Sequence, residues 1–376
     1  MMLRILLPRL IIAMICAGTA SPATAQEWLY KQYTTRDGLS HANVFRVMQD
    51  SMGYIWFATD AGLNRFNSKI FENYFVEDGM SDNSIMSMSE SADGVQYICT
   101  YFNGISVRKG NDIKKLVPTY GTIPDKTLLA LPKKDVLWII AQDWERSLFK
   151  MQADSVQKIS VKDKDGRNVL FFDGYETPHG LLFSTSFGVL GVDENNQLFP
   201  FLASLIKGRV SAIEYSKHDD ALWIATAEQL IKIQKDSVIT AIPLTPSMSV
   251  HDILVDHENA VWIAIGGLGI YKVIGEKLIA VQDRLGLNTT IVNDLFEDRE
   301  GNIWIATHGE GVIKISDRHI AHYTIRKHAL NVYCTDLSFG KDGIIASSIG
   351  MISVLNEKGT IQPLAVSLLK PSQYTY

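Results

Sequence analysis

The stretch DREGNIWIATHGEGVIKI, residues Asp298 to Ile315, carries the pattern that decides the fold. An Asp followed three residues later by a Gly is typical of a type I turn, because Asp caps its own backbone and Gly accepts positive φ. The segment NIWIAT that follows is apolar at nearly every position, which predicts a strand with both faces buried. Together with TIVNDLFED, GVIKIS and HIAHYT, it forms a predicted unit of four short antiparallel strands.

The same unit recurs every 39 to 44 residues along the chain. Eight copies align on one position, which holds a tryptophan in five of them: Trp56, Tyr97, Trp138, Leu182, Trp223, Trp262, Trp304 and Ile344. Self-similarity at this period is typical of an all-β propeller, in which four-stranded antiparallel blades pack face to face around an axis. The tryptophan is predicted to fill the space between neighbouring blades.

The number of blades in the ring stays open between seven and eight. The segment WLYKQYT, Trp28 to Thr34, matches the last strand of a blade but precedes the first copy. We expect it to complete the seventh blade, which would close a propeller over residues 26–325. Residues 326–376 would then hold an eighth repeat and the start of a ninth, as the beginning of a second, truncated propeller. A single ring of eight blades is the alternative.

Residues 1–25 have the features of a secretory signal peptide. Arg4 and Arg9 supply positive charge, LIIAMICAG is a short apolar core, and Ala23-Thr24-Ala25 is a small-residue cleavage site. No later apolar run reaches the roughly 18 residues that a membrane helix needs. We therefore expect an exported, periplasmic protein whose mature chain begins near Gln26.

The net charge, the cysteines and the histidines limit which partners and which metal or disulfide sites are expected. The formal net charge is −5 and becomes more negative without Arg4 and Arg9, so nucleic acid is not an expected partner. Cys99 and Cys334 lie in apolar runs, and two buried free thiols are favoured over a disulfide. His319 and His322 are three residues apart on a strand and face opposite sides, so we expect no metal site and no cofactor.

A secreted glycosidase is the enzymatic alternative, because sialidase-type propellers carry Asp boxes of the form S-x-D-x-G-x-x-W. Here Asp298 and Gly301 are three residues apart instead of two. A hydrolase also needs an acid/base pair, or a Tyr nucleophile with an Arg cluster, and the arginines are scattered along the chain. We expect no catalytic residues and no enzymatic activity.

Two segments carry a family resemblance. GLSHANVFRVMQDSMGYIWFATDAGLNRF, Gly38 to Phe66, and GLNTTIVNDLFEDREGNIWIATHGEGVIKI, Gly286 to Ile315, resemble the two-component regulator propeller repeat. The resemblance covers residues 28–376 and is weakest in copies two to four and eight. It implies a periplasmic sensor region, usually of two seven-bladed propellers, followed by a three-tyrosine domain, a membrane helix and a cytoplasmic kinase or other output domain. The ligands of the best-described branch are oligosaccharides.

Ligand contacts are expected at one end of the ring. In a four-stranded blade, the loop entering the first strand and the loop joining the second and third strands open on the same face, around the channel mouth. The candidate ligand-binding residues in these loops are His41, Asn43, Asp82, Asn83, Tyr101, Asn103, Asp143, Trp144, Glu145, Arg146, Arg209, His308 and Glu310. Trp144 lies outside the repeated tryptophan position, and an aromatic face beside charged groups suits stacking under a sugar ring. Packing of Trp144 against an adjacent loop is the alternative.

These observations favour a periplasmic ligand-sensing propeller of a two-component-type signalling protein, present as a fragment without its output domain. Its expected partners are a small-molecule ligand such as an oligosaccharide, membrane-anchored signalling domains, and a second copy in a homodimer. A propeller that scaffolds other envelope proteins is the alternative that remains from a different class.

Overall fold

The computed structural model describes residues 28–245, 248–285, 287–321, 334–340, 343–348, 351–355 and 361–364. The predicted signal peptide, residues 1–25, lies outside these residues. The chain divides into two compact units, one from Tyr30 to Asp317 and one formed by the residues on either side of it. In the described residues no helix is long and apolar enough to cross a membrane.

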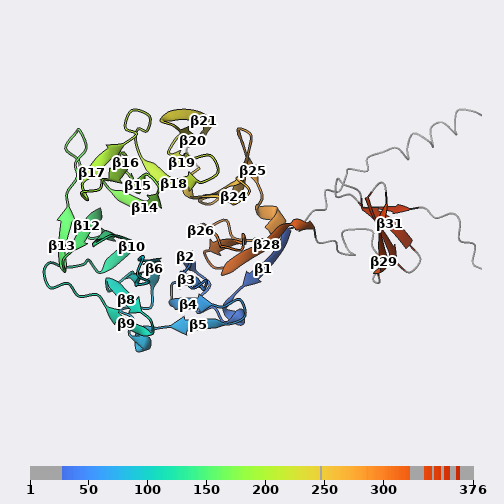
Figure 1. The fold of residues 1–376 in the computed structure, drawn as a ribbon, viewed down its shortest axis with the longest axis horizontal. Coiled ribbons are helices and arrows are strands. Elements are labelled where there is room, and N and C mark those ends of the chain that lie inside the picture. Colours follow the sequence, from blue (N-terminus) through green and yellow to red (C-terminus); the bar gives the residue numbers. More distant parts are fainter. Residues whose placement is uncertain are drawn as a thin grey trace, which may run out of the picture. The chain divides into compact units, whose positions relative to one another are not determined.

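The larger unit is a propeller of seven four-stranded antiparallel sheets. Figure 1 shows them arranged around an axis, and the first strands of neighbouring sheets contact one another around it. Blades 1 to 3 contain β2 (Val44–Gln49), β3 (Ile55–Thr59), β4 (Gly62–Phe66), β5 (Phe71–Tyr74), β6 (Ile85–Glu90), β7 (Gln96–Thr100), β8 (Ile105–Lys109), β9 (Asp112–Lys115), β10 (Lys126–Lys133), β11 (Val136–Gln142), β12 (Arg146–Gln152) and β13 (Ser155–Ile159). Blades 4 to 6 contain β14 (Phe171–Thr177), β15 (Gly180–Thr185), β16 (Gly188–Val192), β17 (Leu198–Phe201), β18 (Val210–Ser216), β19 (Ala221–Thr226), β20 (Gln229–Gln234), β21 (Ser237–Pro243), β22 (Val250–Val255), β23 (Val261–Ile265), β24 (Gly269–Ile274) and β25 (Lys277–Ala280).

Blade 7 joins the two ends of the ring. It consists of β26 (Val292–Glu297), β27 (Ile303–Thr307), β28 (Val312–Ala321) and, at its outer edge, β1 (Trp28–Tyr33). Tyr33 stacks on Trp304 with ring centroids 5.9 Å apart, and Gln32 Nε2 donates to the Glu310 carbonyl at 2.9 Å. The predicted closure by WLYKQYT is confirmed. A ring of eight blades is wrong, because β1 occupies the outer edge of blade 7.

Short 3-10 turns and a further sheet complete the described secondary structure. The turns are η1 (Thr35–Asp37), η2 (Val76–Asp78) and η3 (Gln282–Leu285). In the second unit, β29 (Cys334–Gly340), β30 (Gly343–Ser348), β31 (Met351–Leu355) and β32 (Ile361–Leu364) form one four-stranded sheet in chain order. This sheet corresponds to the eighth repeat, and a second propeller beginning there stays a prediction.

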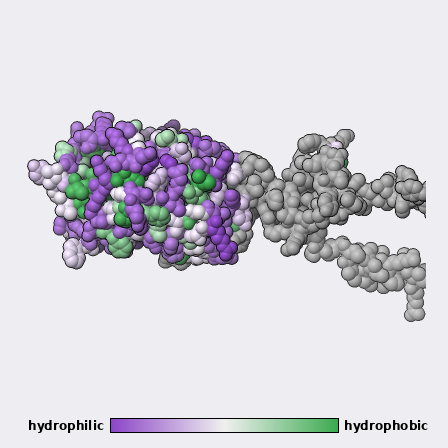
Figure 2. All heavy atoms as spheres, turned by 90° about the horizontal axis from the view of Figure 1, so that it is seen from below, coloured by the Kyte–Doolittle hydropathy of each residue, from purple (hydrophilic) through white to green (hydrophobic). Residues whose placement is uncertain are grey.

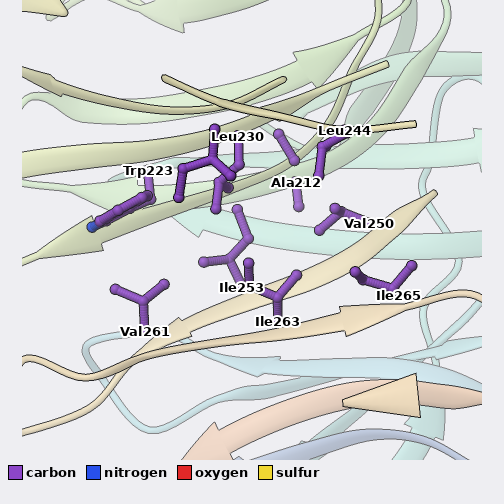
Figure 3. Close-up of a cluster of buried hydrophobic side chains, with 11 residues drawn as sticks. Ala212, Trp223, Leu230, Leu244, Val250, Ile253, Val261, Ile263 and Ile265 are labelled. Carbon is purple, nitrogen blue, oxygen red and sulfur yellow. The ribbon is translucent and has the colours of Figure 1, made fainter. Parts of the chain in front are cut away.

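The repeated tryptophans pack between blades, as predicted. Trp304 of blade 7 is 1% exposed. The centre of its ring lies 5.4 Å from that of Phe57 and 5.9 Å from that of Phe66, both in blade 1. Trp223 of blade 5 lies in a cluster with Ile253 and Ile263 of blade 6 (Figure 3). Each blade therefore buries the apolar face of its neighbour. On the outside, the face drawn in Figure 2 is mostly hydrophilic, with apolar residues in small separate groups.

In three blades, the turn before the tryptophan strand has a second role that the sequence did not predict. Asp298 Oδ1 accepts from the backbone N–H of Asn302 at 2.8 Å, and Oδ2 accepts from the indole N–H of Trp304 at 2.7 Å. Asp50 and Asp256 make the same indole bond in blades 1 and 6. The same carboxylate thus fixes the turn and orients the side chain that fills the gap between blades.

Candidate functional site

The two kinds of loop predicted to share one end of the ring do so. In blade 2, the backbone N–H of Tyr101, in the turn after β7, donates to the carbonyl of Ser84, just before β6, at 2.9 Å. In blade 7, His308 N–H donates in the same way to Ile291 at 3.0 Å. These bonds tie each turn to the loop entering its own inner strand, so both loops border the mouth of the channel.

Several of the predicted ligand-binding residues use their side chains to hold these loops. Asn83 Oδ1 accepts from the Val76 N–H at 2.8 Å, and Asn103 Nδ2 donates to the Ser81 carbonyl at 2.8 Å. The side chains of Asp82 and His41 each accept from a backbone N–H two residues further on, in Ser84 and Asn43. Their polar atoms are thus engaged in loop structure.

Two other pairs of contacts lie elsewhere around the mouth. Lys126 lies 4.1 Å from the centre of the Tyr101 ring and donates to its hydroxyl at 2.9 Å. On blade 7, His308 is exposed, and Glu310 Oε2 accepts from the Asn288 N–H at 3.3 Å. The predicted residues are therefore distributed around the mouth and do not form one cluster.

The hairpin that joins β11 and β12 is rigidly built. Asp143 accepts from Ser147 Oγ at 2.9 Å and pairs with Lys158 at 2.6 Å. Although burial opposes it, the hydrogen bond from Lys158 and those within the hairpin lower the pKa of Asp143 to about 2. Glu145 accepts from Asn168 Nδ2 at 3.0 Å, which connects the hairpin to the segment preceding β14.

Trp144 stands at the tip of this hairpin and is 97% exposed. Its packing against an adjacent loop, the alternative considered from the sequence, is wrong. A tryptophan normally buries much of its large apolar surface. The exposed ring of Trp144 is therefore available to a ligand, and its exposure is compatible with the stacking role predicted for it.

Two of the predicted residues, Arg146 and Arg209, are brought together by the fold. Arg146 begins β12 in blade 3, and Arg209 directly precedes β18 in blade 5. Their guanidinium carbons lie 5.7 Å and 4.5 Å from the ring centre of Phe172, on β14 of blade 4 between them. Burial and the neighbouring Arg209 lower the pKa of Arg146. Arginines that are scattered in the sequence are thus grouped here, because three consecutive blades converge on the mouth.

Four carboxyl groups and one guanidinium line the channel itself, and sequence reasoning missed all five. Arg46 pairs with Asp173 and, at 3.3 Å, with Asp294. Arg46 and Asp294, together with Glu214 and Asp252, border a cavity of about 610 Å³. A signal was present in the sequence: Arg46, Asp252 and Asp294 each stand two residues after the repeated aliphatic positions Val44, Val250 and Val292, where the structure has a bulge.

These carboxyl groups connect neighbouring blades. Asp294 Oδ2 of blade 7 accepts from the Val47 N–H of blade 1 at 2.7 Å, and Asp252 Oδ2 of blade 6 accepts from the Leu295 N–H of blade 7 at 2.7 Å. Burial raises the pKa of Glu214 to about 8, and burial also raises the pKa values of Asp252 and Asp294. Asp252 and Asp294 thus hold neighbouring blades together by hydrogen bonds. This structural role explains their presence in the channel without a ligand.

Residues 286–309 match the family model described as the two component regulator propeller. The chain carries a two component regulator propeller repeat. The matched segment contains the turn and tryptophan strand of blade 7, so the resemblance stated for Gly286 to Ile315 is confirmed. No curated protein matches the chain.

Solved structures share the fold of this chain at low identity. Two structures of the extracellular domain of BT4673 from B. thetaiotaomicron, described as a one component or hybrid two component system, are 16% and 15% identical, each with a TM-score of 0.62. The match covers 90% of this chain but 47% of that one, so the chain spans about half the length of this structural relative. Virginiamycin B lyase from Staphylococcus aureus is 17% identical with a TM-score of 0.55, over 77% of this chain and 98% of its own. PorZ of Porphyromonas gingivalis, a bacterial surface component of the type-IX secretion system, is 13% identical with a TM-score of 0.59, over 87% and 55%.

The cysteines and the possible metal ligands are also among the residues considered from the sequence. Cys99 is a buried free thiol, as predicted, and burial raises its pKa to about 12. The side chain of Cys334 lies outside the described residues, as do those of His319 and His322. Among the residues that the structure describes, no group of His, Cys, Asp and Glu is arranged to hold a metal ion.

Proposed function

We propose that this chain is an exported ligand-sensing propeller of a signal-transduction protein. The observation that carries the proposal is the regulator propeller repeat at residues 286–309, in a ring whose fold is similar to an extracellular domain described as part of a one component or hybrid two component system. In this proposal residues 1–25 direct export to the periplasm, and membrane-anchored signalling domains receive the signal.

The ligand of this proposal binds at the loop end of the ring. Trp144 presents an exposed aromatic face, and Arg146 and Arg209 lie at the same end without a hydrogen bond or ion pair in the described part of the chain. Aromatic faces beside hydrogen-bonding groups are typical of sugar sites, so an oligosaccharide is the proposed ligand class. Binding would bias how two receptor chains associate, because a ligand shifts the equilibrium toward the arrangement that it binds more tightly.

A screen of the secreted chain, lacking residues 1–25, against neutral and acidic oligosaccharides tests the proposal. We expect at least one oligosaccharide to raise the melting temperature and bind in calorimetry, and Trp144→Ala to abolish binding while the fold stays intact. Tyr120→Ala is the matched control, because Tyr120 is also an exposed aromatic, at 69%. Unchanged affinity in Trp144→Ala would remove this site.

The same screen separates the other two functions. Product formation from any oligosaccharide would favour an enzyme. This outcome is included because a lyase shares the fold at low identity. The absence of binding across a broad screen, together with capture of envelope proteins, would favour a scaffold. The proposed sensor binds its ligand and releases it unchanged.

A further inference from the structure

Two guanidinium groups share one aromatic ring at the mouth of the channel. Arg146 and Arg209 lie 5.7 Å and 4.5 Å from the centre of Phe172, close enough that Arg209 disfavours the charge of Arg146. Like charges that lie close together repel each other, and a bound opposite charge offsets this repulsion. Within the described part of the chain, neither guanidinium has a carboxylate partner or a hydrogen bond.

The nearby carboxylates already have other partners. Asp173, the residue after Phe172, accepts from Arg46 and, at 3.3 Å, from the hydroxyl of Tyr175. Asp143 pairs with Lys158, and the Glu145 carboxylate accepts from Asn168. Asp173 favours the charge of Arg146 through space, but neither arginine has an ion pair of its own among the described residues.

The three residues are held by backbone that is fixed independently of their side chains. Arg146 pairs with Gln142 in the β11–β12 ladder. Phe172 is the extra residue of the β14 bulge, between Phe171 and Asp173. Arg209 directly precedes Val210, which pairs with Thr226. Because a strand end, a bulge and the start of a strand fix the backbone of these residues, part of the arrangement is present before any ligand binds, which lowers the entropic cost of binding.

We propose that Arg146, Phe172 and Arg209 form an anion site for a carboxylate or sulfate group. Guanidinium groups bind both anions through paired charge-assisted hydrogen bonds, and both cations lie against the Phe172 ring, 5.7 Å and 4.5 Å from its centre. Trp144 lies in the turn just before Arg146, the first residue of β12. In this proposal its indole stacks on the sugar ring that carries the acidic group. The ligand class is therefore an acidic sugar, either a uronic acid or a sulfated sugar; the sugar part rests on the proposed function, whereas the anion part does not.

The anion part is tested with inorganic sulfate alone. In nuclear magnetic resonance titrations of the secreted chain, we expect sulfate to shift the Nε–Hε signals of Arg146 and Arg209 in a saturable way. Chloride at the same ionic strength should leave them in place. Arg36→Gln, which removes one exposed positive charge from η1 between β1 and β2, is the control variant, and saturation should survive in it. Shifts that are linear in sulfate, or equal for all exposed arginines, would overturn the anion site.

The sugar part is tested with matched pairs that differ only in the acidic group: galacturonic acid against galactose, and glucose 6-sulfate against glucose. We expect the acidic member to bind at least tenfold more tightly, and Arg146→Gln or Arg209→Gln to remove that preference by weakening the acidic member about tenfold. Preference for the carboxylate or for the sulfate identifies which acidic sugar is bound. If both members of a pair bind equally through Trp144, the acidic-sugar inference is overturned and a neutral-sugar sensor remains. If sulfate binds saturably but no sugar binds, the proposed oligosaccharide ligand is overturned and the anion site remains.

Discussion

The indole nitrogen of Trp304 donates a 2.7 Å hydrogen bond to Oδ2 of Asp298, the residue that also shapes the turn before its strand. Both side chains are buried. The indole N–H of Trp138 and that of Trp223 are also buried but have no partner. In those two blades Pro132 and Lys217 stand six residues before the tryptophan, where the other tryptophan blades have Asp.

This difference predicts unequal effects of the same substitution. Trp304→Phe should reduce the free energy of unfolding by about 1–2 kcal/mol more than Trp138→Phe, because only Trp304 donates its indole N–H to a buried carboxylate, whose Oδ2 would keep the hydrogen bond from Asn302 alone. Denaturant unfolding of both variants measures the difference. Equal losses would contradict the energetic role of the Asp298 carboxylate in holding the indole.

Closure of the ring predicts the effect of Tyr33→Ala. Tyr33 is the last residue of β1 and stacks on Trp304, while also meeting the edge of Phe66 at 5.1 Å. Its truncation should cost about 3–5 kcal/mol as a cavity between the last and first blades. Hydrogen exchange should speed up in β28 and β2 before it does in β14, on the other side of the ring. Uniform exchange throughout the ring would show that β1 does not act as the closing strand.

The channel predicts a pH dependence of stability. The folded-state pKa of Glu214 is about 8, above the ordinary 4.5, because of burial. The stability that this group contributes is therefore fully present below pH 4.5 and is lost as the pH rises through 8. Glu214→Gln should flatten the pH dependence between 5 and 9, gaining about 1–3 kcal/mol relative to the wild type at pH 9 and nothing at pH 4.

Thermal and denaturant unfolding at both pH values measure this difference. Glu176→Gln is a suitable control, since Glu176 is exposed on the β14 strand of the neighbouring blade and no described hydrogen bond involves its side chain. If Glu214→Gln has the same stability as the wild type at every pH, the carboxyl of Glu214 is ionised in the folded protein.

Cys99 should be chemically inert in the folded protein. It is fully buried in blade 2, and burial raises its thiol pKa to about 12, so little thiolate exists at pH 8. Iodoacetamide at pH 8 should leave the Cys99 peptide unmodified in the native protein and modify it in denaturant, as read by mass spectrometry. Modification of the native protein at the rate of an exposed thiol would show that blade 2 opens.

The sequence by itself determined the blade, whereas the tertiary structure decided which residues meet at the mouth of the ring. Turn chemistry at Asp298 and Gly301, strand burial around Trp304 and the period of the repeat are local properties, so they could be predicted without the fold. The site could not, because Arg146, Phe172 and Arg209 belong to three successive blades and become neighbours only when inner strands line up around an axis. The roles of Asn83 and Asn103 also needed the structure, since a loop amide looks the same in sequence whether it binds a ligand or its own backbone.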